Sequence, residues 1–283
     1  MGVWRREHVP VMRVTVLSVQ GSTPREAGAF MLVSPTGQTG TIGGGDVEWT
    51  CLSLARAALA SGTDGEGACP GEMRFVLGPE TGQCCGGAMV VRFSFVGDLA
   101  EEEEAERSAR GAWPRLAVFG AGHVGRALMR CASFLPLSLR WIDPREEEFG
   151  PVPQGVETRV SDAWEEELAA LRAGDGVLVM TPSHRLDALI AAAALERGDL
   201  AYVGLIGSRT KRRRFEAAFL RTGLSQAQIA PLVCPVGDRG VRDKRPEIIA
   251  ALIAAELAVT LVARDGYRAP LRTRRTETGD TNP

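Results

Sequence analysis

One stretch in the second half of the chain restricts the fold more than any other. The apolar run 116–119 leads directly into Gly120-Ala121-Gly122-His123-Val124-Gly125, and a segment with helical spacing follows. The next apolar run, 137–142, ends in Asp143, about twenty residues beyond the glycines. This order of strand, G-x-G-x-x-G turn, helix, strand and acid is typical of a dinucleotide-binding unit.

Each part of this motif has a physical task in such a unit. Gly120, Gly122 and Gly125 allow a tight turn, close approach of the backbone to a pyrophosphate, and close packing of helix on strand. Asp143 is then expected to accept a hydrogen bond from a ribose hydroxyl. We predict Gly120, Gly122, His123, Gly125 and Asp143 as cofactor-binding residues.

Further strands and helices alternate after this unit. Residues 177–180 and 202–206 read as strands, and the alanine-rich segment 186–195 reads as a helix between them. The alternation predicts a parallel sheet with right-handed crossovers, and ligands of such sheets bind beyond the carboxyl ends of the strands.

Candidate ligand contacts follow two of these strands. They are His184 in Thr181-Pro182-Ser183-His184 and the segment Gly207-Ser208-Arg209. We expect His123 and His184 to be hydrogen-bonding contacts rather than metal ligands, because both sit where strands end. The basic run 211–214 has two interpretations: it binds phosphate, or it forms a solvated helix face.

The first half predicts a small α+β domain. Residues 11–19, 29–34, 73–77 and 89–95 have the composition or alternation of strands, and 47–59 has apolar residues at helical spacing. The glycine run that opens this helix is either an anion site or a tight turn.

The sequence divides into an α/β arrangement of two domains. We place an N-terminal α+β domain at 1–98, an acidic linker at 99–113, a Rossmann-like domain at 114–270 and a disordered polar tail at 271–283.

Two neighbouring thiols lie between the last two strands of the first half, in Gly82-Gln83-Cys84-Cys85-Gly86-Gly87. Adjacent Cα atoms are about 3.8 Å apart, which disfavours a disulfide, and side chains of an extended segment alternate in direction. One thiol can therefore face the core while the other faces a ligand. The alternative is that both are compact apolar fillers at a turn.

Composition excludes several function classes. The 283 residues are 45% hydrophobic and 24% charged, with a net charge of −2, so nucleic acid and anionic membranes are not expected partners. The six cysteines lack paired C-x-x-C spacing, which argues against structural zinc. The N-terminus lacks an apolar signal region, and the longest apolar stretch, 248–263, is too short and polar to span a bilayer. We expect a cytoplasmic protein with reduced thiols.

Six motifs in this order carry a resemblance to a known family. They are Gly21-Ser22-Thr23-Pro24-Arg25, Ile42-Gly43-Gly44-Gly45-Asp46-Val47-Glu48, Gly82-Gln83-Cys84-Cys85-Gly86-Gly87, Phe119-Gly120-Ala121-Gly122-His123-Val124-Gly125, Asp143-Pro144-Arg145 and Tyr202-Val203-Gly204-Leu205-Ile206-Gly207-Ser208. The chain resembles the XdhC/CoxI family, accessory proteins for xanthine dehydrogenase and related molybdenum hydroxylases.

The resemblance implies a function that the residue patterns alone do not show. It implies a non-catalytic chaperone that binds molybdenum cofactor (molybdopterin), protects it during sulfuration and delivers it to the apo-hydroxylase. It also implies contact with a cysteine desulfurase and a homodimer. Gln83, Cys84 and Cys85 would then contact the cofactor, with Cys84 or Cys85 touching molybdenum or accepting sulfur, since thiolate is a soft ligand.

Two alternatives remain open. The glycine motif and Asp143 also suit an NAD(P)-dependent oxidoreductase. An adaptor that binds only proteins would use the same fold without a small ligand. One departure bears on these readings: many relatives have two histidines in the segment where this chain has Thr181-Pro182-Ser183-His184, which weakens a metal site there.

Overall fold

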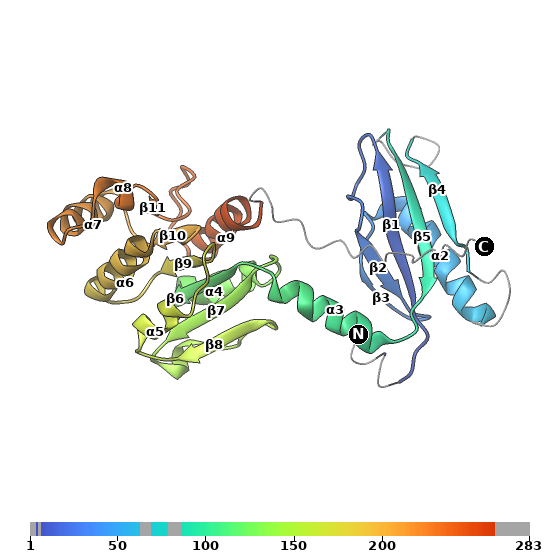
Figure 1. The fold of residues 1–283 in the computed structure, drawn as a ribbon, viewed down its shortest axis with the longest axis horizontal. Coiled ribbons are helices and arrows are strands. Elements are labelled where there is room, and N and C mark those ends of the chain that lie inside the picture. Colours follow the sequence, from blue (N-terminus) through green and yellow to red (C-terminus); the bar gives the residue numbers. More distant parts are fainter. Residues whose placement is uncertain (1–3, 5–6, 63–68, 79–85, 264–283) are drawn as a thin grey trace, which may run out of the picture. The chain divides into compact units, whose positions relative to one another are not determined.

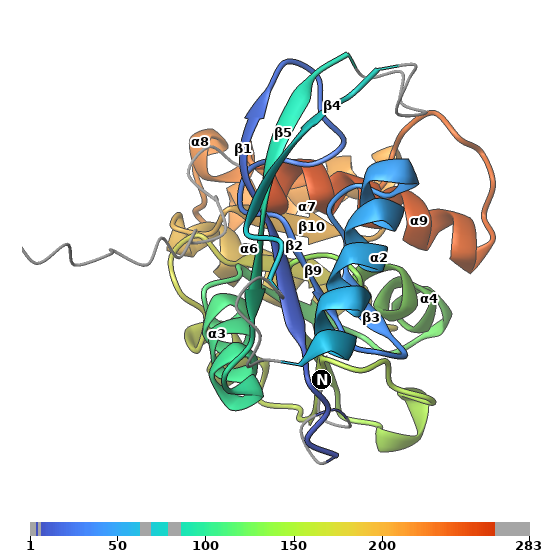
Figure 2. The ribbon, with the colours of Figure 1, turned by 90° about the vertical axis from the view of Figure 1, so that its right-hand side faces the viewer.

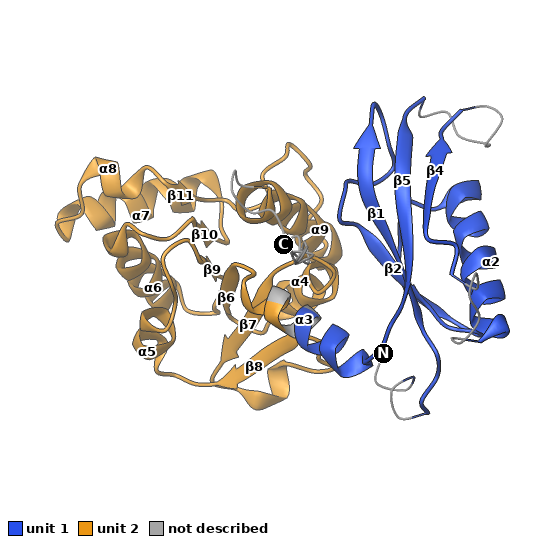
Figure 3. Ribbon diagram, turned by 45° about the vertical axis from the view of Figure 1, so that its right-hand side comes forward, with its two compact units in different colours: residues 1–107, 270–283 blue, residues 108–269 orange. Residues whose placement is uncertain are grey.

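The computed structural model describes residues 4, 7–62, 69–78 and 86–263. The chain divides into two compact units, with the division between residues 107 and 108 (Figure 3). The division falls within helix α3 (Leu99–Gly111), inside the acidic segment that the sequence predicts as a linker. No helix in the described part of the chain is long and apolar enough to cross a membrane.

The first unit is an antiparallel sheet with one helix against it (Figures 1 and 2). Within the described residues the sheet has five strands in the order β3-β2-β1-β5-β4. They are β1 (Met12–Gln20), β2 (Phe30–Val33), β3 (Gln38–Gly40), β4 (Glu72–Val76) and β5 (Ala88–Phe95), and the helix is α2 (Gly45–Ser61). β1 lies between β2 and β5 and pairs antiparallel with both.

Alternation along the strands sets the core of this unit. Met12, Val14 and Val16 of β1 are fully buried, and they pack in one cluster with Val47 and Cys51 of α2. A strand with one face against a helix requires this period of two. The small α+β domain predicted from the sequence is therefore confirmed as a fold, with the ends of the predicted strands shifted by at most one residue and β3 as an additional strand.

The second unit is a parallel sheet with helices on both faces (Figure 1). The described residues form six strands in the order β11-β10-β9-β6-β7-β8. They are β6 (Arg115–Phe119), β7 (Ser138–Asp143), β8 (Val156–Val160), β9 (Gly176–Val179), β10 (Tyr202–Leu205) and β11 (Leu232–Val233). This confirms the α/β class and the Rossmann-like arrangement of the second half.

Two apolar clusters cover the two faces of this sheet. Leu116 and Val118 of β6 face one cluster, whereas Ala117 and Phe119 face the other. The first face is covered by α4 (His123–Ala132) and α9 (Pro246–Leu257), which continues as the π-helical turn η3 (Ala258–Val262). The second is covered by α5 (Trp164–Ala169), α6 (His184–Arg197), α7 (Arg209–Arg221) and α8 (Gln226–Ile229).

A buried carboxylate explains why an acid interrupts the apolar sequence of α9. Glu256 is 7% exposed, and its Oε1 accepts a hydrogen bond of 2.7 Å from the Tyr202 hydroxyl. Its Oε2 accepts one of 3.1 Å from the Gly237 N–H, so one side chain joins α9, β10 and the loop after β11. Burial, and then the neighbouring Glu256 carboxylate, raise the pKa of Tyr202 well above its ordinary value.

The variant Tyr202→Phe should destabilise the second unit by about 1–3 kcal/mol, because it leaves a buried carboxylate oxygen without its donor. Glu256→Gln should cost less, because the amide can accept from Gly237 and donate to the tyrosine oxygen. Urea unfolding followed by tryptophan fluorescence measures both. Wild-type stability in Tyr202→Phe would show that this network is not structural.

Candidate functional site

The strand order of the second unit fixes where a ligand site belongs. β7 and β8 lie to one side of β6, and β9, β10 and β11 lie to the other, so the order in which strands are added switches sides between β6 and β9. Ligands of open α/β sheets bind at the carboxyl ends of the strands at this switch point. The residues that follow β6 and β9 therefore border the expected crevice.

The glycines of the loop after β6 have three different roles. Gly120 has φ of +115°, and a Cβ there would lie 2.4 Å from the Met180 carbonyl oxygen, so two loops meet in direct backbone contact. A Cβ on Gly125 would lie 2.6 Å from the Gly120 oxygen. A Cβ on Gly122 would meet no described atom within 4 Å, so this position faces open space.

The N-terminus of α4 is available to an anion. Gly122 is its N-cap, and no side chain of the described residues caps it. The first N–H groups of a helix lack intrahelical partners and carry the positive end of the helix dipole. Open space at Gly122 and uncapped N–H groups together fit the phosphate of a ligand.

Asp143 holds the glycine loop in place. It is 2% exposed, and its Oδ2 accepts hydrogen bonds from the Ala121 N–H at 2.8 Å and from Arg145 Nη2 at 2.9 Å. Its Oδ1 accepts from Nε of Arg145 at 2.9 Å and from the Arg145 N–H at 3.0 Å. Burial opposes ionisation, but the hydrogen bonds from Arg145 and Ala121 outweigh it and hold the pKa of Asp143 below its ordinary value.

The four bonds have a consequence for the expected ribose contact. A carboxylate offers about four acceptor positions, and in this structure Ala121 and Arg145 use that capacity. A ribose hydroxyl at Asp143 would compete with Arg145. The contact therefore stays a prediction.

The loop after β9 carries His184 and a residue that the sequence reasoning missed. His184 begins α6 and its side chain is 72% exposed. Its Nδ1 lies 3.8 Å from Oδ2 of Asp187, which is fully buried in the first turn of the same helix. The sequence does contain a signal that could have identified Asp187. It is the only charged residue of the alanine-rich segment 186–195, and it lies three positions after His184.

The segment after β10 has mainly structural partners. Ser208 caps α7, its hydroxyl accepting from the Lys211 N–H at 3.2 Å. Arg209 pairs with Asp238 at 3.1 Å and is 82% exposed. In the basic run, Arg212 donates to the Leu232 carbonyl at 2.6 Å and so holds the start of β11. Contact of Gly207, Ser208 or Arg209 with a ligand stays a prediction.

Three motifs of the first unit converge at one end of its sheet. A Cβ on Gly87 would lie 2.2 Å from the Ser22 carbonyl oxygen, and a Cβ on Gly43 would lie 2.5 Å from the ring of Pro24. The turn after β1 thus packs against both the glycine run before α2 and the glycine pair before β5. Gln83, Cys84 and Cys85 lie outside the described residues, directly before this pair.

The glycine run of the first unit already contains an anion. Oε2 of Glu48 accepts hydrogen bonds from the Ile42 N–H at 2.9 Å, the Gly44 N–H at 3.0 Å and the Thr41 hydroxyl at 2.5 Å. Burial opposes ionisation, but these bonds hold the pKa of Glu48 below its ordinary value. Of the two readings of this run, the structure favours the turn.

Burial disfavours the reactive thiolate form of the buried thiols among the described residues. Burial raises the pKa of Cys51 to about 12 and that of Cys234 to about 11. In the part of the chain that the structure describes, no group of three or more His, Cys, Asp or Glu side chains is arranged to hold a metal ion.

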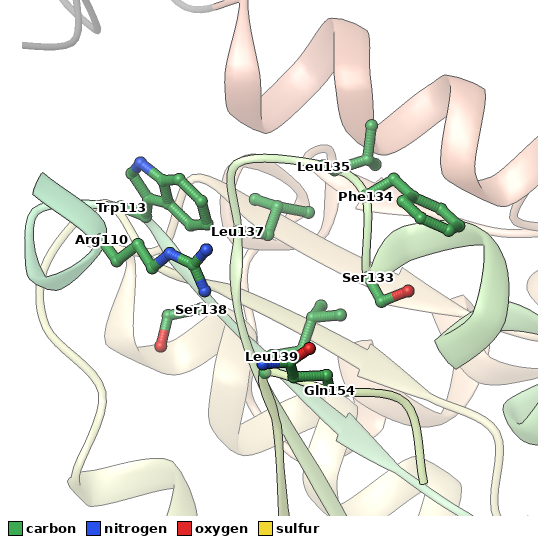
Figure 4. Close-up of a pocket in the computed structure, with 10 residues that line it drawn as sticks. Arg110, Trp113, Ser133, Phe134, Leu135, Leu137, Ser138, Leu139 and Gln154 are labelled. Carbon is green, nitrogen blue, oxygen red and sulfur yellow. The ribbon is translucent and has the colours of Figure 1, made fainter. Parts of the chain in front are cut away.

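A cavity of about 240 Å³ lies at the opposite, amino-terminal edge of the parallel sheet (Figure 4). Leu137 and Leu139 form part of its wall, and the Arg110 guanidinium lies 5.6 Å from the Trp113 ring centroid at its side. None of the predicted cofactor-binding residues lines it. It is therefore separate from the carboxyl-edge site.

Comparisons with known proteins agree with this architecture. A family model described as the XdhC Rossmann domain matches residues 116–257, and one described as the XdhC and CoxI family matches residues 4–66. The uncharacterized protein YqeB of Escherichia coli (strain K12) is 30% identical over 256 residues, which cover 89% of this chain and 43% of YqeB. The chain thus spans less than half of that relative.

A solved structure has a similar fold. The crystal structure of a Bacillus halodurans protein described as a xanthine dehydrogenase superposes with a TM-score of 0.74 and 21% identity, covering 93% of this chain and 94% of the other. At this identity the likeness shows the fold alone.

Because the glycines of this loop have different surroundings, replacing them with alanine should change the stability of the second unit by different amounts. Gly125→Ala should destabilise the second unit by more than about 1 kcal/mol, because its Cβ collides with backbone. Gly122→Ala should leave stability nearly unchanged, since its φ of −67° suits any residue and the space is open. Urea unfolding of the two variants compares them, and equal stabilities would contradict the assigned roles.

Glu48→Gln should lower the stability of the first unit at pH 7 by about 1 kcal/mol, because hydrogen bonds to a charged acceptor are replaced by weaker ones. A carboxylate with a depressed pKa stabilises the fold above its unfolded pKa, and this contribution is lost as pH falls through the folded value. The difference from wild type should therefore shrink below about pH 4.

Hydrogen exchange of β1 amides measures this stability within the first unit. Asp46→Asn is the matched control, because Asp46 is exposed in the same helical turn. A difference that stays constant to low pH would contradict the role of the Glu48 charge.

Proposed function

Because the chain belongs to the XdhC and CoxI family, we propose that it acts in the maturation of a xanthine dehydrogenase or related molybdenum hydroxylase, as a carrier of molybdenum cofactor. The match to both family models and the fold shared with the Bacillus halodurans protein support this role. The partners of such a carrier would be the apo-hydroxylase and a cysteine desulfurase, with a homodimer as the working form.

The open, uncapped N-terminus of α4 is the observation that carries the proposal. Molybdopterin ends in a phosphate, and the loop at Gly122 combines free space with unpartnered first-turn N–H groups. In our proposal Gly120 and Gly125 fix the shape of this loop, and Gly122 leaves room for phosphate oxygens. His123 and His184 border the same edge and would contact the rest of the ligand.

The thiol pair supplies the second part of the proposal. When bound, the cofactor supplies a redox-active molybdenum held by a dithiolene, for which a thiolate is a soft partner. Gln83, Cys84 and Cys85 lie outside the described residues, and Gly87, two positions beyond Cys85, has its backbone packed against the Ser22 carbonyl. Cys84 or Cys85 would contact the metal or carry sulfur as a persulfide.

An NAD(P)-dependent oxidoreductase is the second candidate, because the glycine loop also fits a pyrophosphate. The engagement of Asp143 with Arg145 weighs against it, since the acid that would bind the ribose is already used. Titration with NADH separates the candidates: tight binding with turnover of a hydroxy or keto substrate would favour the oxidoreductase.

The carrier should co-purify with its cofactor. Protein isolated without oxygen from cells with an intact pterin pathway should contain molybdenum and, after oxidation, show pterin fluorescence. Gly122→Ala should lower the bound pterin about tenfold or more while the protein stays folded, because its methyl group occupies the phosphate position. Protein that carries neither metal nor pterin would overturn the proposal.

The thiols have their own test. Cys84→Ala with Cys85→Ala should reduce retained molybdenum more than it reduces pterin, because the thiols are assigned to the metal and the glycine loop to the phosphate. Cys51→Ala is the matched control for loss of a thiol, and it should leave the metal-to-pterin ratio unchanged. An unchanged ratio in the double variant would remove the thiol role.

A further inference from the structure

The buried carboxylate of Asp187 has one oxygen fully engaged and one without a partner. Its Oδ1 accepts from the Thr181 N–H at 3.0 Å and from the Thr181 hydroxyl at 2.9 Å. Its Oδ2 is buried and has no hydrogen-bond partner among the described residues. A buried carboxylate oxygen without a donor is costly, so a native structure that keeps one requires an explanation.

The ring of His184 lies close enough to supply a donor. Nδ1 of His184 lies 3.8 Å from Oδ2, and both residues are in the first turn of α6, three positions apart. Residues with this spacing lie on one side of a helix. The imidazole is 72% exposed, so little packing opposes a rotation of the ring that would shorten this distance.

Asp187 itself is not free to turn toward solvent. The two bonds from Thr181 hold Oδ1 in place, and the hydroxyl of Thr181 is held in turn by the Ser183 N–H at 3.2 Å. Burial raises the pKa of Asp187, against the hydrogen bonds from Thr181 and the positive charge of Lys211. The loop after β9 therefore presents one fixed, buried acceptor to the histidine.

We propose that Asp187 is a positioning residue for His184: the Nδ1–H donates to Asp187 Oδ2, which leaves Nε2 as an unprotonated acceptor at the edge of the crevice. The hydrogen bond that one ring nitrogen makes decides which nitrogen carries the proton. A neutral ring held in this way accepts a hydrogen bond from an N–H or O–H group of the ligand. This assignment of the ligand contact rests on the proposed binding of a phosphate-bearing ligand at Gly122.

The geometry makes the effect of Asp187→Asn specific. The Thr181 N–H can only donate to the Oδ1 position, so the oxygen of the new amide takes that place. Its NH₂ group then faces His184 and donates to Nδ1, which moves the ring proton to Nε2. The variant should thus invert the tautomer of His184 without removing the side chain that fills the space.

Nitrogen-15 NMR of the histidine rings tests this in the ligand-free protein at pH 8. The chain has three histidines, His8, His123 and His184, and His184→Gln assigns the signal. We expect wild-type His184 in the Nδ1–H form and Asp187→Asn in the Nε2–H form. Glu196→Gln, an equal change of charge at an exposed position of α6, should leave the wild-type pattern.

Two results would overturn the inference: an Nε2–H tautomer of His184 in the wild-type protein, or an unchanged tautomer in a folded Asp187→Asn variant. The unperturbed His123 signal reports that the variant is folded. Should Asp187→Asn fail to fold, the wild-type tautomer alone decides. Because no ligand is present, the outcome is independent of whether the purified protein carries a pterin.

Discussion

The candidate site of the second unit depends on the backbone contact between Gly120 and Met180 at the switch point of the parallel sheet. Gly120 lies so close to the Met180 carbonyl that no side chain fits between them, and its φ of +115° is one that other residues rarely adopt. This contact brings the loop after β6 against the loop after β9. Asp143 then fixes the same loop through the Ala121 N–H. The helix N-terminus, His184 and Asp187 owe their positions to this arrangement.

Both units have a glycine-rich turn and a carboxylate at the start of a helix, but the carboxylate comes from a different part of the chain in each. In each, a glycine-rich turn opens a helix, and a nearby carboxylate accepts hydrogen bonds from backbone N–H groups of the turn. In the first unit that carboxylate is Glu48, which lies on the helix itself and accepts from the Ile42 and Gly44 N–H groups of the turn before it. In the second unit Asp143 comes from the next strand, so the N–H groups at the start of α4 stay available. The sequence patterns alone do not separate these two cases, because both read as glycines before a helix.

The sequence predicted those strands and helices whose residues follow a local apolar periodicity. The alternation of β1 and β5 and the order around Gly120 predicted both sheets, since buried strands need apolar residues at fixed spacing. It did not find β3 and β8, which are polar edge strands, or β11, which has only two residues, because none of them carries a long enough apolar pattern. The predicted glycine roles could be refined only when their surroundings were known, as the difference between Gly122 and Gly125 shows. The partners of Asp143 and the buried position of Asp187 depend on contacts between distant segments, which composition and spacing do not report.

α4 offers open N–H groups to a phosphate, whereas Glu48 already accepts hydrogen bonds from the Ile42 and Gly44 N–H groups before α2. Amide chemical shifts of the wild-type protein during titration with pyrophosphate test both parts at once. We predict that the amide signals of Gly122, His123, Val124 and Gly125 shift on addition of pyrophosphate, and that those of Ile42 and Gly44 do not. Shifts at Ile42 and Gly44, or unchanged amide signals at the start of α4, would contradict this expectation.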